Sequence, residues 1–376
     1  MAGAVRQPID VASLERYIGR NVPEIKTPID VKQFGYGQSN PTYLLTAADK
    51  TKFVLRKKPP GQLLSKTAHK VDREYRIIHA LEKTDVPVPK AYCLCEDDAV
   101  IGTAFYIMEF LDGRIFEDPS LPKVKPEDRT KMWHSAIITL AKFHRVDPKS
   151  VGLASFGKHS GFYNRQLNTF GTISEAQAQT LDVETKEPVG KLPHYDDMFA
   201  FFKDPKTQPK DRGTFVHGDY KIDNLVFHKT EPRVIGILDW EMSTIGHPLS
   251  DLSNLLTPFV TAGRNADLLG RVSNSDAFLP GRTRGLPPKD ELLALYQQVA
   301  GWDPSVELPW GEAFGLYRGS IILQGIAARY ALRQASSARA KEFGGGRIGM
   351  AELAWDLEFW IVARKKRSKL RGKRTS

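Results

Sequence analysis

A polar stretch at residues 217–224, with the sequence HGDYKIDN, constrains this 376-residue chain more than any other feature. It fits the pattern H-x-D-x-x-x-x-N and leads directly into an apolar run. A second apolar run follows and ends at Asp239, fifteen residues after Asn224. Short apolar runs between polar turn residues are typical of buried strands. The sequence therefore predicts two short strand–loop units, at residues 215–227 and 234–240.

The polar residues on these loops are the types that phosphoryl transfer from ATP requires. A carboxylate must orient the attacking hydroxyl and accept its proton, and oxygen ligands must hold Mg²⁺ on the phosphates. Asp219 suits the first role, and Asn224 and Asp239 suit the second, because Mg²⁺ prefers hard oxygen ligands. Each residue alone has a simpler interpretation, since Asp and Asn form turns and Asp caps helices. Together, at this spacing, they predict an ATP- and Mg²⁺-dependent kinase.

The patterns along the rest of the chain predict a strand-rich first lobe and a mainly helical second lobe. We expect strands at 31–34, 43–46, 52–56, 91–95 and 103–110, and helices within 65–83, 133–144, 313–336 and 350–363. The segment 151–192, which is rich in Gly, Ser, Thr and Gln, is interpreted as loops and short helices. Since one hydrophobic core rarely serves 376 residues, we expect an α+β protein with a lobe at 1–108, a lobe at 109–363 and a basic tail at 364–376.

Several motifs together resemble the aminoglycoside phosphotransferase and choline kinase family. The resemblance is most specific to the phosphotransferase domains that occur alone or fused to acyl-CoA dehydrogenases. It implies a bilobal protein-kinase-like fold with ATP and Mg²⁺ as cofactors. The matching stretches are FGYGQSNPTYLL (34–45), FVLRKKPPG (53–61), REY (73–75), YIMEFLDG (106–113), HGDYKIDNLVF (217–227) and ILDWEMSTIGHPLSDLSNLL (237–256).

The resemblance also implies nucleotide-binding residues in the first lobe. Gly35, Gly37, Ser39 and Asn40 would belong to a hairpin whose backbone N–H groups approach the ATP phosphates. Asn40 stands where protein kinases have the third glycine of this hairpin, so the hairpin resembles that of small-molecule kinases. Met108 and Phe110 would lie at the hinge between the lobes, where the backbone receives adenine.

Arg56 aligns with the position at which kinases usually carry a phosphate-binding lysine. Arginine can pair with phosphate bidentately, and Glu74 on the following helix would be its ion-pair partner. Lys57 and Lys58 remain alternatives for the phosphate contact. Strand alternation favours Arg56, which shares a face with Val54.

Three further residues near the predicted site are interpreted as structural. His217 is expected to fix its loop, and His144 is expected to be a buried histidine at the end of a helix. Asp251 either braces the catalytic loop, as the resemblance implies, or caps a helix. The sequence leaves these two roles of Asp251 open.

Charge and cysteine content narrow the class of protein. The formal net charge is +10, and much of the excess lies in residues 364–374. Such a block is typical of a solvated segment, and we do not expect nucleic acid as a partner. No apolar run is long enough to span a bilayer, so we expect a cytoplasmic protein without a membrane partner, with peroxisome and nucleus left open. Cys93 and Cys95 are interpreted as a reduced pair on one face of a strand.

The phosphate acceptor is the part of the function that the sequence describes least. Arginines at 282, 284, 318, 329 and 333 favour an anionic acceptor over a cationic one. The resemblance to dehydrogenase-fused domains indicates a hydroxy acid or a hydroxyacyl-CoA. An aminoglycoside or amino-alcohol kinase and a catalytically weak kinase-like scaffold are the alternatives, and the oligomeric state is left open.

Overall fold

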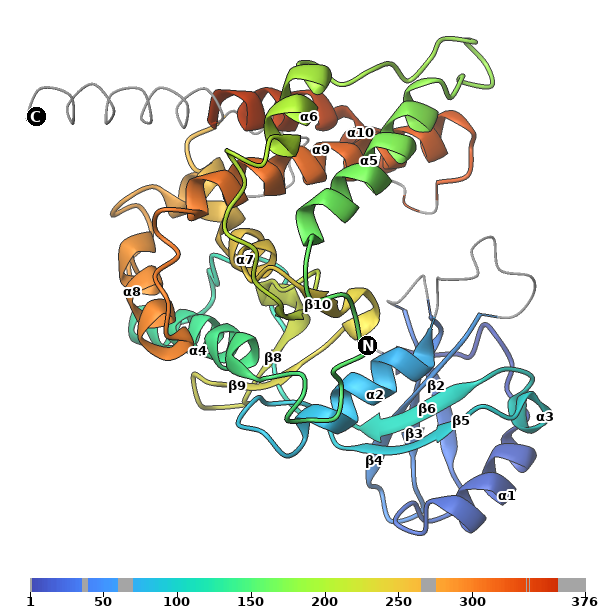
Figure 1. The fold of residues 1–376 in the computed structure, drawn as a ribbon. Helices are drawn as coiled ribbons and strands as arrows, with labels where there is room; N and C mark the ends of the chain where they lie inside the picture. Colours follow the sequence, from blue (N-terminus) through green and yellow to red (C-terminus); the bar gives the residue numbers. More distant parts are fainter. Residues whose placement is uncertain are drawn as a thin grey trace, which may run out of the picture. The chain divides into compact units, whose positions relative to one another are not determined.

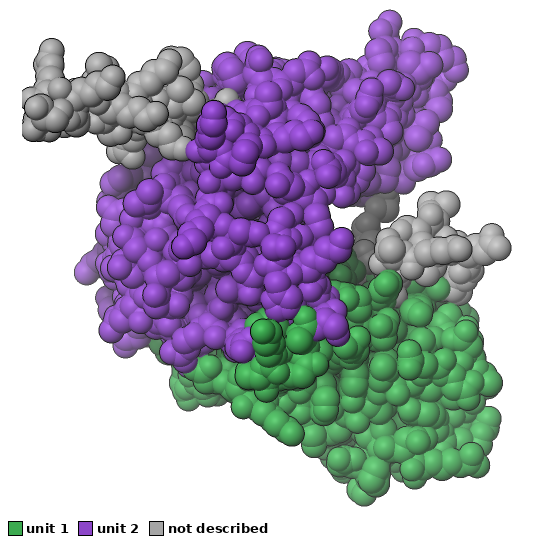
Figure 2. Space-filling model, in the orientation of Figure 1, with its two compact units in different colours: residues 1–115, 148–154, 224–243 green, residues 116–147, 155–223, 244–376 purple. Residues whose placement is uncertain are grey.

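The computed structural model describes residues 2–35, 40–59, 70–264, 275–335, 337 and 339–357. The chain divides into two compact units, shown in different colours in Figure 2. Unit 1 comprises Met1–Ile115, Pro148–Ala154 and Asn224–Ser243; unit 2 comprises Phe116–Asp147, Ser155–Asp223 and Thr244–Ser376. The lobe boundary expected at residue 108 stays a prediction, and the basic tail lies outside the described residues.

In the described part of unit 1, six antiparallel strands form a sheet with the order β1-β2-β3-β4-β6-β5 (Figure 1). The predicted meander and the two later strands are confirmed within two residues at each end. The strands are β1 (Ala2–Gly3), β2 (Asp30–Phe34), β3 (Thr42–Thr46), β4 (Lys52–Lys57), β5 (Ala91–Cys95) and β6 (Phe105–Glu109).

Successive strand residues point to opposite faces of this sheet, so both faces present side chains against which helices pack. Helix α1 (Val11–Asn21) begins at Asp10, whose carboxylate accepts a hydrogen bond from the Ser13 N–H. It buries Leu14 and Ile18 in one core with sheet residues such as Leu55. Helix α2 (Val71–Leu81) packs against β5 and β6 on the other face, toward which Arg56 points. A short helix, α3 (Asp98–Ile101), joins β5 to β6.

A small hairpin completes unit 1 and carries two of the predicted site residues. Strands β8 (Leu225–Phe227) and β9 (Val234–Ile237) pair antiparallel, with the short helices η1 (Ile222–Asn224) and η2 (Trp240–Met242) at their ends. Gly113 allows the preceding chain to approach this hairpin, since a Cβ there would lie 2.3 Å from the Phe227 carbonyl oxygen. The predicted strand–loop units are therefore confirmed.

Unit 2 is built from helices around an aromatic core. Trp310, Phe314 and Tyr317 of helix α9 (Leu308–Ala331) pack with Tyr163 and Phe202. A two-stranded pair, β7 (Thr214–Val216) with β10 (Thr244–Gly246), lies before and after the hairpin in sequence. The helices are α4 (Pro126–Arg145), α5 (Phe162–Ala178), α6 (Tyr195–Lys203), α7 (Leu249–Thr261), η3 (Ser275–Phe278), α8 (Lys289–Ala300), α9 (Leu308–Ala331) and α10 (Ala340–Gly345), followed by helical residues 347–357.

The interpretation of residues 151–192 as loops and short helices is wrong for its central part. Helix α5 has 17 residues and lies against α9. Its interior contains Gly171 and several residues of low helix propensity. Packing against the core stabilises this helix in place of intrinsic helix propensity, because Phe162, Tyr163 and Leu167 are buried in the aromatic core.

The cysteine prediction is confirmed, since Cys93 and Cys95 are free and buried on one face of β5. No helix among the described residues is long and apolar enough to span a membrane.

Candidate active site

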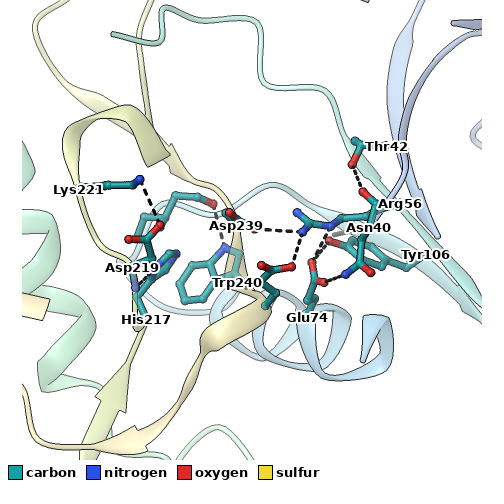
Figure 3. A network of polar contacts seen from close by, with 12 residues as sticks. Asn40, Thr42, Arg56, Glu74, Tyr106, His217, Asp219, Lys221, Asp239 and Trp240 are labelled. Atoms are coloured by element: carbon teal, nitrogen blue, oxygen red, sulfur yellow. Dashed lines mark hydrogen bonds and ion pairs between the residues drawn. The ribbon is translucent and has the colours of Figure 1, made fainter. Parts of the chain in front are cut away.

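Arg56 of β4 is the centre of a charged cluster in unit 1 (Figure 3). Its Nε lies 3.1 Å from Oε2 of Glu74, and its Nη2 lies 3.0 Å from Oδ1 of Asp239. Glu241 provides a third carboxylate, 3.3 Å from Nη2. The Arg56 guanidinium therefore contacts both Glu74, its predicted ion-pair partner, and Asp239, a predicted metal ligand. Of the two alternatives, Lys57 points to the opposite face of the strand, and neither Lys57 nor Lys58 forms any of these contacts.

Glu74 is fixed by neutral hydrogen bonds as well as by Arg56. The Asn40 side-chain amide donates to Oε1 at 2.7 Å, and the Tyr106 hydroxyl donates to Oε2 at 3.0 Å. The side chain is 1% exposed. Burial raises the pKa of Glu74 to about 7, although the Arg56 charge opposes this rise. Asn40 thus ties the end of the predicted phosphate hairpin to helix α2.

The β8–β9 hairpin brings Asn224 and Asp239 close together. Leu225 pairs with Ile237, and the Leu238 N–H donates to the Asn224 carbonyl oxygen at 2.8 Å. Asp239 follows directly, with a left-handed backbone (φ 64°) at the start of η2. Its side chain forms no capping hydrogen bond. The simpler interpretation of Asp239 as a helix cap therefore does not describe its side chain, which contacts Arg56.

These two residues have the chemistry that Mg²⁺ requires. Mg²⁺ usually takes one or two protein carboxylates and completes its shell with phosphate and water oxygens. Asp239 offers a carboxylate whose side chain is 39% exposed, and Asn224 offers an amide oxygen. Among the described residues, no three His, Cys, Asp or Glu side chains group to hold a metal. A Mg²⁺ ion that arrives on ATP does not need three such protein ligands, because phosphate and water oxygens complete its shell. Asn224 and Asp239 therefore suit this ion.

Asp219 lies in unit 2, on the loop between β7 and η1. Gly218 before it has a positive φ of 88°, which favours glycine. The backbone N–H groups of His217 and Gly218 donate to the two carboxylate oxygens of Asp251 at 2.7 and 2.8 Å. Asp251, in the first turn of α7, is completely buried. Of its two open roles, the structure supports the brace for the loop.

His144 extends this brace into the core of unit 2. Its Nε2 lies 3.2 Å from Oδ2 of Asp251, and the Tyr296 hydroxyl lies 2.7 Å from its Nδ1. Burial alone would raise the pKa of Asp251, but the hydrogen bond and charge of His144 hold it below its usual value. The buried carboxylate is therefore kept ionised, and His144 is the buried structural histidine that the sequence predicted.

Three side chains near Asp219 were not assigned there from sequence. Lys221 Nζ lies 3.3 Å from Oδ2 of Asp219, and the Asn254 amide donates to Oδ1 at 3.4 Å. Arg318 of α9 donates to the Gly218 carbonyl oxygen at 2.7 Å. Lys221 lies inside the motif and could have been found by its position. Asn254 and Arg318 are distant in sequence, and only the packing of α7 and α9 reveals them.

The other predicted nucleotide-binding residues lie in the phosphate hairpin and at the end of β6. Gly35 is exposed, whereas Gly37 and Ser39 lie outside the described residues. Met108 is a buried residue of β6, paired with Val54, and Phe110 follows this strand with the Lys52 ammonium 5.4 Å from its ring centre. Their roles in nucleotide binding stay predictions.

The chain has relatives of known family. The sequence model of the phosphotransferase enzyme family matches residues 30–286. Acyl-CoA dehydrogenase family member 11 of Gallus gallus is 38% identical over 89% of this chain and 41% of its own length. Family member 10 of Mus musculus is 37% identical over 92% of this chain and 31% of its own length. The chain thus spans about two fifths or less of these relatives.

Solved structures agree with this match. A structure from Ralstonia eutropha JMP134, assigned as an aminoglycoside phosphotransferase, is 35% identical with a TM-score of 0.80 and covers 93% of this chain and 98% of that one. The streptomycin–ATP complex of APH(2")-IIa, 17% identical with a TM-score of 0.54, shares the fold. The predicted kinase-like α+β fold is confirmed, and the chain belongs to the phosphotransferase enzyme family.

Proposed function

We propose that this chain is an ATP-dependent small-molecule kinase in which Asp219 is the general base and Asn224 and Asp239 bind the Mg²⁺ that accompanies ATP. One observation carries the proposal. Arg56, the candidate phosphate-binding cation, lies 3.0 Å from Asp239, the candidate metal ligand. In kinases, a cation contacts the ATP phosphates and a carboxylate holds the Mg²⁺ bound to the same phosphates, so proximity of these two groups supports the assignment.

The other residues of unit 1 would hold the nucleotide. Arg56 would pair with the phosphates while Glu74 keeps its guanidinium oriented. The backbone of the hairpin at Gly35, Gly37, Ser39 and Asn40 would approach the phosphate oxygens. Backbone groups at Met108 and Phe110 would receive adenine. The bound Mg²⁺ would supply charge neutralisation on the phosphates.

Asp219 would orient the acceptor hydroxyl and accept its proton. The hydrogen bonds from His217 and Gly218 to Asp251 fix the backbone that carries Asp219. Lys221, with its Nζ 3.3 Å from Oδ2, forms an ion pair with this carboxylate. Positioning of this kind supplies much of the catalysis in phosphoryl transfer.

We further propose that the acceptor is a hydroxy acid or a hydroxyacyl-CoA. The similarity to chains named acyl-CoA dehydrogenase supports an acyl substrate. An aminoglycoside or amino-alcohol acceptor is the second candidate, because chains of similar fold include an aminoglycoside phosphotransferase in complex with streptomycin. Asp219, Asn224 and Asp239 are all present, which argues against a scaffold that has lost catalysis.

A screen of ATP consumption tests the proposed acceptor. Purified protein is incubated with MgATP and hydroxy acids, their CoA esters, amino alcohols or aminoglycosides, and ADP release is measured. Asp219→Asn, which keeps the shape of the side chain, is the matched control for each acceptor. We expect turnover only with hydroxy acids or their thioesters. Efficient turnover of amino alcohols or aminoglycosides alone would disprove the anionic acceptor but not the kinase.

A further inference from the structure

Arg318 of helix α9 is a partly buried cation beside the loop that carries Asp219. Its Nη2 donates to the Gly218 carbonyl oxygen at 2.7 Å. Among the described residues, this carbonyl is its single hydrogen-bond acceptor, and no carboxylate forms an ion pair with it. A guanidinium has five N–H donors in a planar fork. Most donors of Arg318 are therefore unused, although burying a charge is costly unless it is paired.

The other arginines considered as acceptor ligands lie in different surroundings. Arg282, Arg284 and Arg329 are exposed. Arg333 is already paired, with Nη1 3.0 Å from Asp182 and Nη2 2.8 Å from Glu184. Exposed or paired arginines need no ligand to explain them. Arg318 differs from Arg282, Arg284 and Arg329 because it is partly buried, and from Arg333 because no carboxylate forms an ion pair with it. It is also the arginine of this group that contacts the candidate catalytic loop.

The peptide that Arg318 contacts directly precedes Asp219. Its carbonyl group belongs to Gly218, whose N–H donates to Oδ1 of Asp251 at 2.8 Å. An anion bound by the remaining N–H groups of Arg318 would therefore lie close to Asp219. Arg318 is partly exposed, and among the described residues none of its unused nitrogens is completely buried without a partner. A small ligand can accordingly approach them.

A second donor without a partner lies near Arg318. The Tyr163 hydroxyl of α5 is buried and has no hydrogen-bond partner among the described residues. Its ring packs against Phe314, with ring centres 4.8 Å apart. Phe314 and Arg318 are four residues apart on α9 and so share a helix face. Burial raises the pKa of Tyr163 well above its usual value, so this hydroxyl remains a donor, and the Arg318 charge acts on it.

We propose that Arg318 binds an oxyanion of the phosphoryl acceptor and thereby holds the acceptor hydroxyl at Asp219. The inference rests on the proposed function, because it concerns the acceptor of that same site. The oxyanion is either the carboxylate of a hydroxy acid or a phosphate group of CoA, since a guanidinium binds both bidentately. A cationic acceptor is disfavoured, because its ammonium group would face an unpaired guanidinium.

Ligand binding measured by saturation-transfer NMR tests this role without requiring turnover. The probes are 3-hydroxybutyrate, its uncharged analogue 3-hydroxybutyramide, and CoA. The variants are Arg318→Gln, which keeps a donor for Gly218 but loses the charge, and Arg318→Lys, which keeps the charge. Arg329→Gln removes an exposed arginine of the same helix and is the matched control.

We expect wild type to bind 3-hydroxybutyrate or CoA, and the bound probe identifies the oxyanion. Loss of a hydrogen bond to a charged group should weaken that binding about tenfold or more in Arg318→Gln. Arg318→Lys should retain part of the affinity, and Arg329→Gln should match wild type. In turnover, Arg318→Gln should raise the KM of the anionic acceptor and leave that of the uncharged amide unchanged.

Three results would overturn this role. The first is that wild type binds neither anion, and the second is that Arg318→Gln binds the anion as well as wild type does. The third is an equal loss of anionic and uncharged acceptors in Arg318→Gln, which would assign Arg318 to loop structure alone. Calorimetry with MgATP separates a failure of the oxyanion site at Arg318 from a failure of the kinase assignment. Normal MgATP binding with any of these results rejects the oxyanion site but not the kinase, whereas absent MgATP binding rejects the kinase itself.

Discussion

Arg56 contacts three carboxylates in unit 1, so its substitution should affect both nucleotide use and folding. Arg56→Ala leaves the buried Glu74 without its cation, which typically costs about 3–5 kcal/mol. We expect Arg56→Lys, which keeps the charge but not the fork, to raise the KM of ATP about tenfold. Lys57→Met and Lys58→Ala should change it less than twofold, because neither lysine joins this cluster. Equal effects in all three kinetic variants would show that the strand is assigned wrongly.

His247 predicts how stability depends on pH. It is completely buried; its Nε2–H donates to the Lys210 carbonyl, and its Nδ1 accepts the Leu249 N–H, so the neutral ring fits the fold. Burial lowers its pKa to about 4 from an ordinary value of 6.5. The unfolded chain therefore binds the proton first. The resulting stability is complete above about pH 6.5 and is lost as the pH falls toward 4.

Urea unfolding at pH 7 and pH 5 measures this effect. The His247 contribution should fall by about 2 kcal/mol between these values. His247→Gln cannot be protonated, so its pH dependence should be smaller by that amount. His79→Gln, at an exposed position, is the control and should keep the wild-type slope. An unchanged slope in His247→Gln would contradict the assignment of the neutral ring.

Strand and helix patterns predicted the elements of unit 1 better than those of unit 2. The meander, β5, β6 and the β8–β9 hairpin follow from alternating apolar residues between turn residues. Helix α5 was missed because its local sequence favours loops and its stability comes from α9. Helices α1, α6 and α8 were not predicted, although Leu14 and Ile18 in α1 show helical spacing. Local sequence patterns therefore predicted the elements whose stability does not depend on packing between distant segments.

The site was predictable where its residues are close in sequence. Asp219, Asn224 and Asp239 belong to two motifs that are neighbours in the sequence, and the pairing of Arg56 with Glu74 followed from the resemblance. The brace by His144 and the contact of Arg318 join segments about 100 residues apart. No local pattern encodes such contacts, because they depend on how α4, α7 and α9 pack.

Two glycines test the close approach of the chain to the β8–β9 hairpin. In Gly113→Ala, the new Cβ would lie 2.3 Å from the Phe227 carbonyl oxygen, so backbone must move. We expect a loss of about 2 kcal/mol or more in unfolding free energy. In Gly19→Ala, inside α1, nothing lies within 4 Å, and stability should rise by about 0.5–1 kcal/mol. Thermal unfolding of both variants measures these shifts. A Gly113→Ala variant as stable as wild type would refute the contact, and Gly19→Ala is the control.

At the scale of the whole molecule, the candidate residues are divided between the two units. Asp219 belongs to unit 2, and Asn224 and Asp239 belong to unit 1. The proposed reaction requires all three to act on one nucleotide and one acceptor. Variants in either unit should therefore impair the same reaction.

The basic segment at residues 364–376 is predicted to be dispensable for this reaction. It holds eight Lys and Arg residues and no acid, so its removal leaves a formal charge of +2. A charge block of this kind adds to long-range attraction for polyanions rather than to a packed core. Deletion after Ala363 should leave kcat within about twofold and weaken any binding to polynucleotide. Loss of turnover in a folded deletion variant would assign the segment to the active site.

Calorimetric titration with MgATP tests the kinase assignment most directly, using wild type, Asp239→Ala, Asn224→Ala and Asp219→Asn. Asp112→Ala, an exposed carboxylate of unit 1, is the control. We predict that Asp239→Ala and Asn224→Ala each weaken MgATP binding, while the control does not. Asp219→Asn should still bind MgATP but lose turnover by about 10²-fold, as is typical of general-base removal. Unchanged MgATP affinity in Asp239→Ala would contradict the assignment.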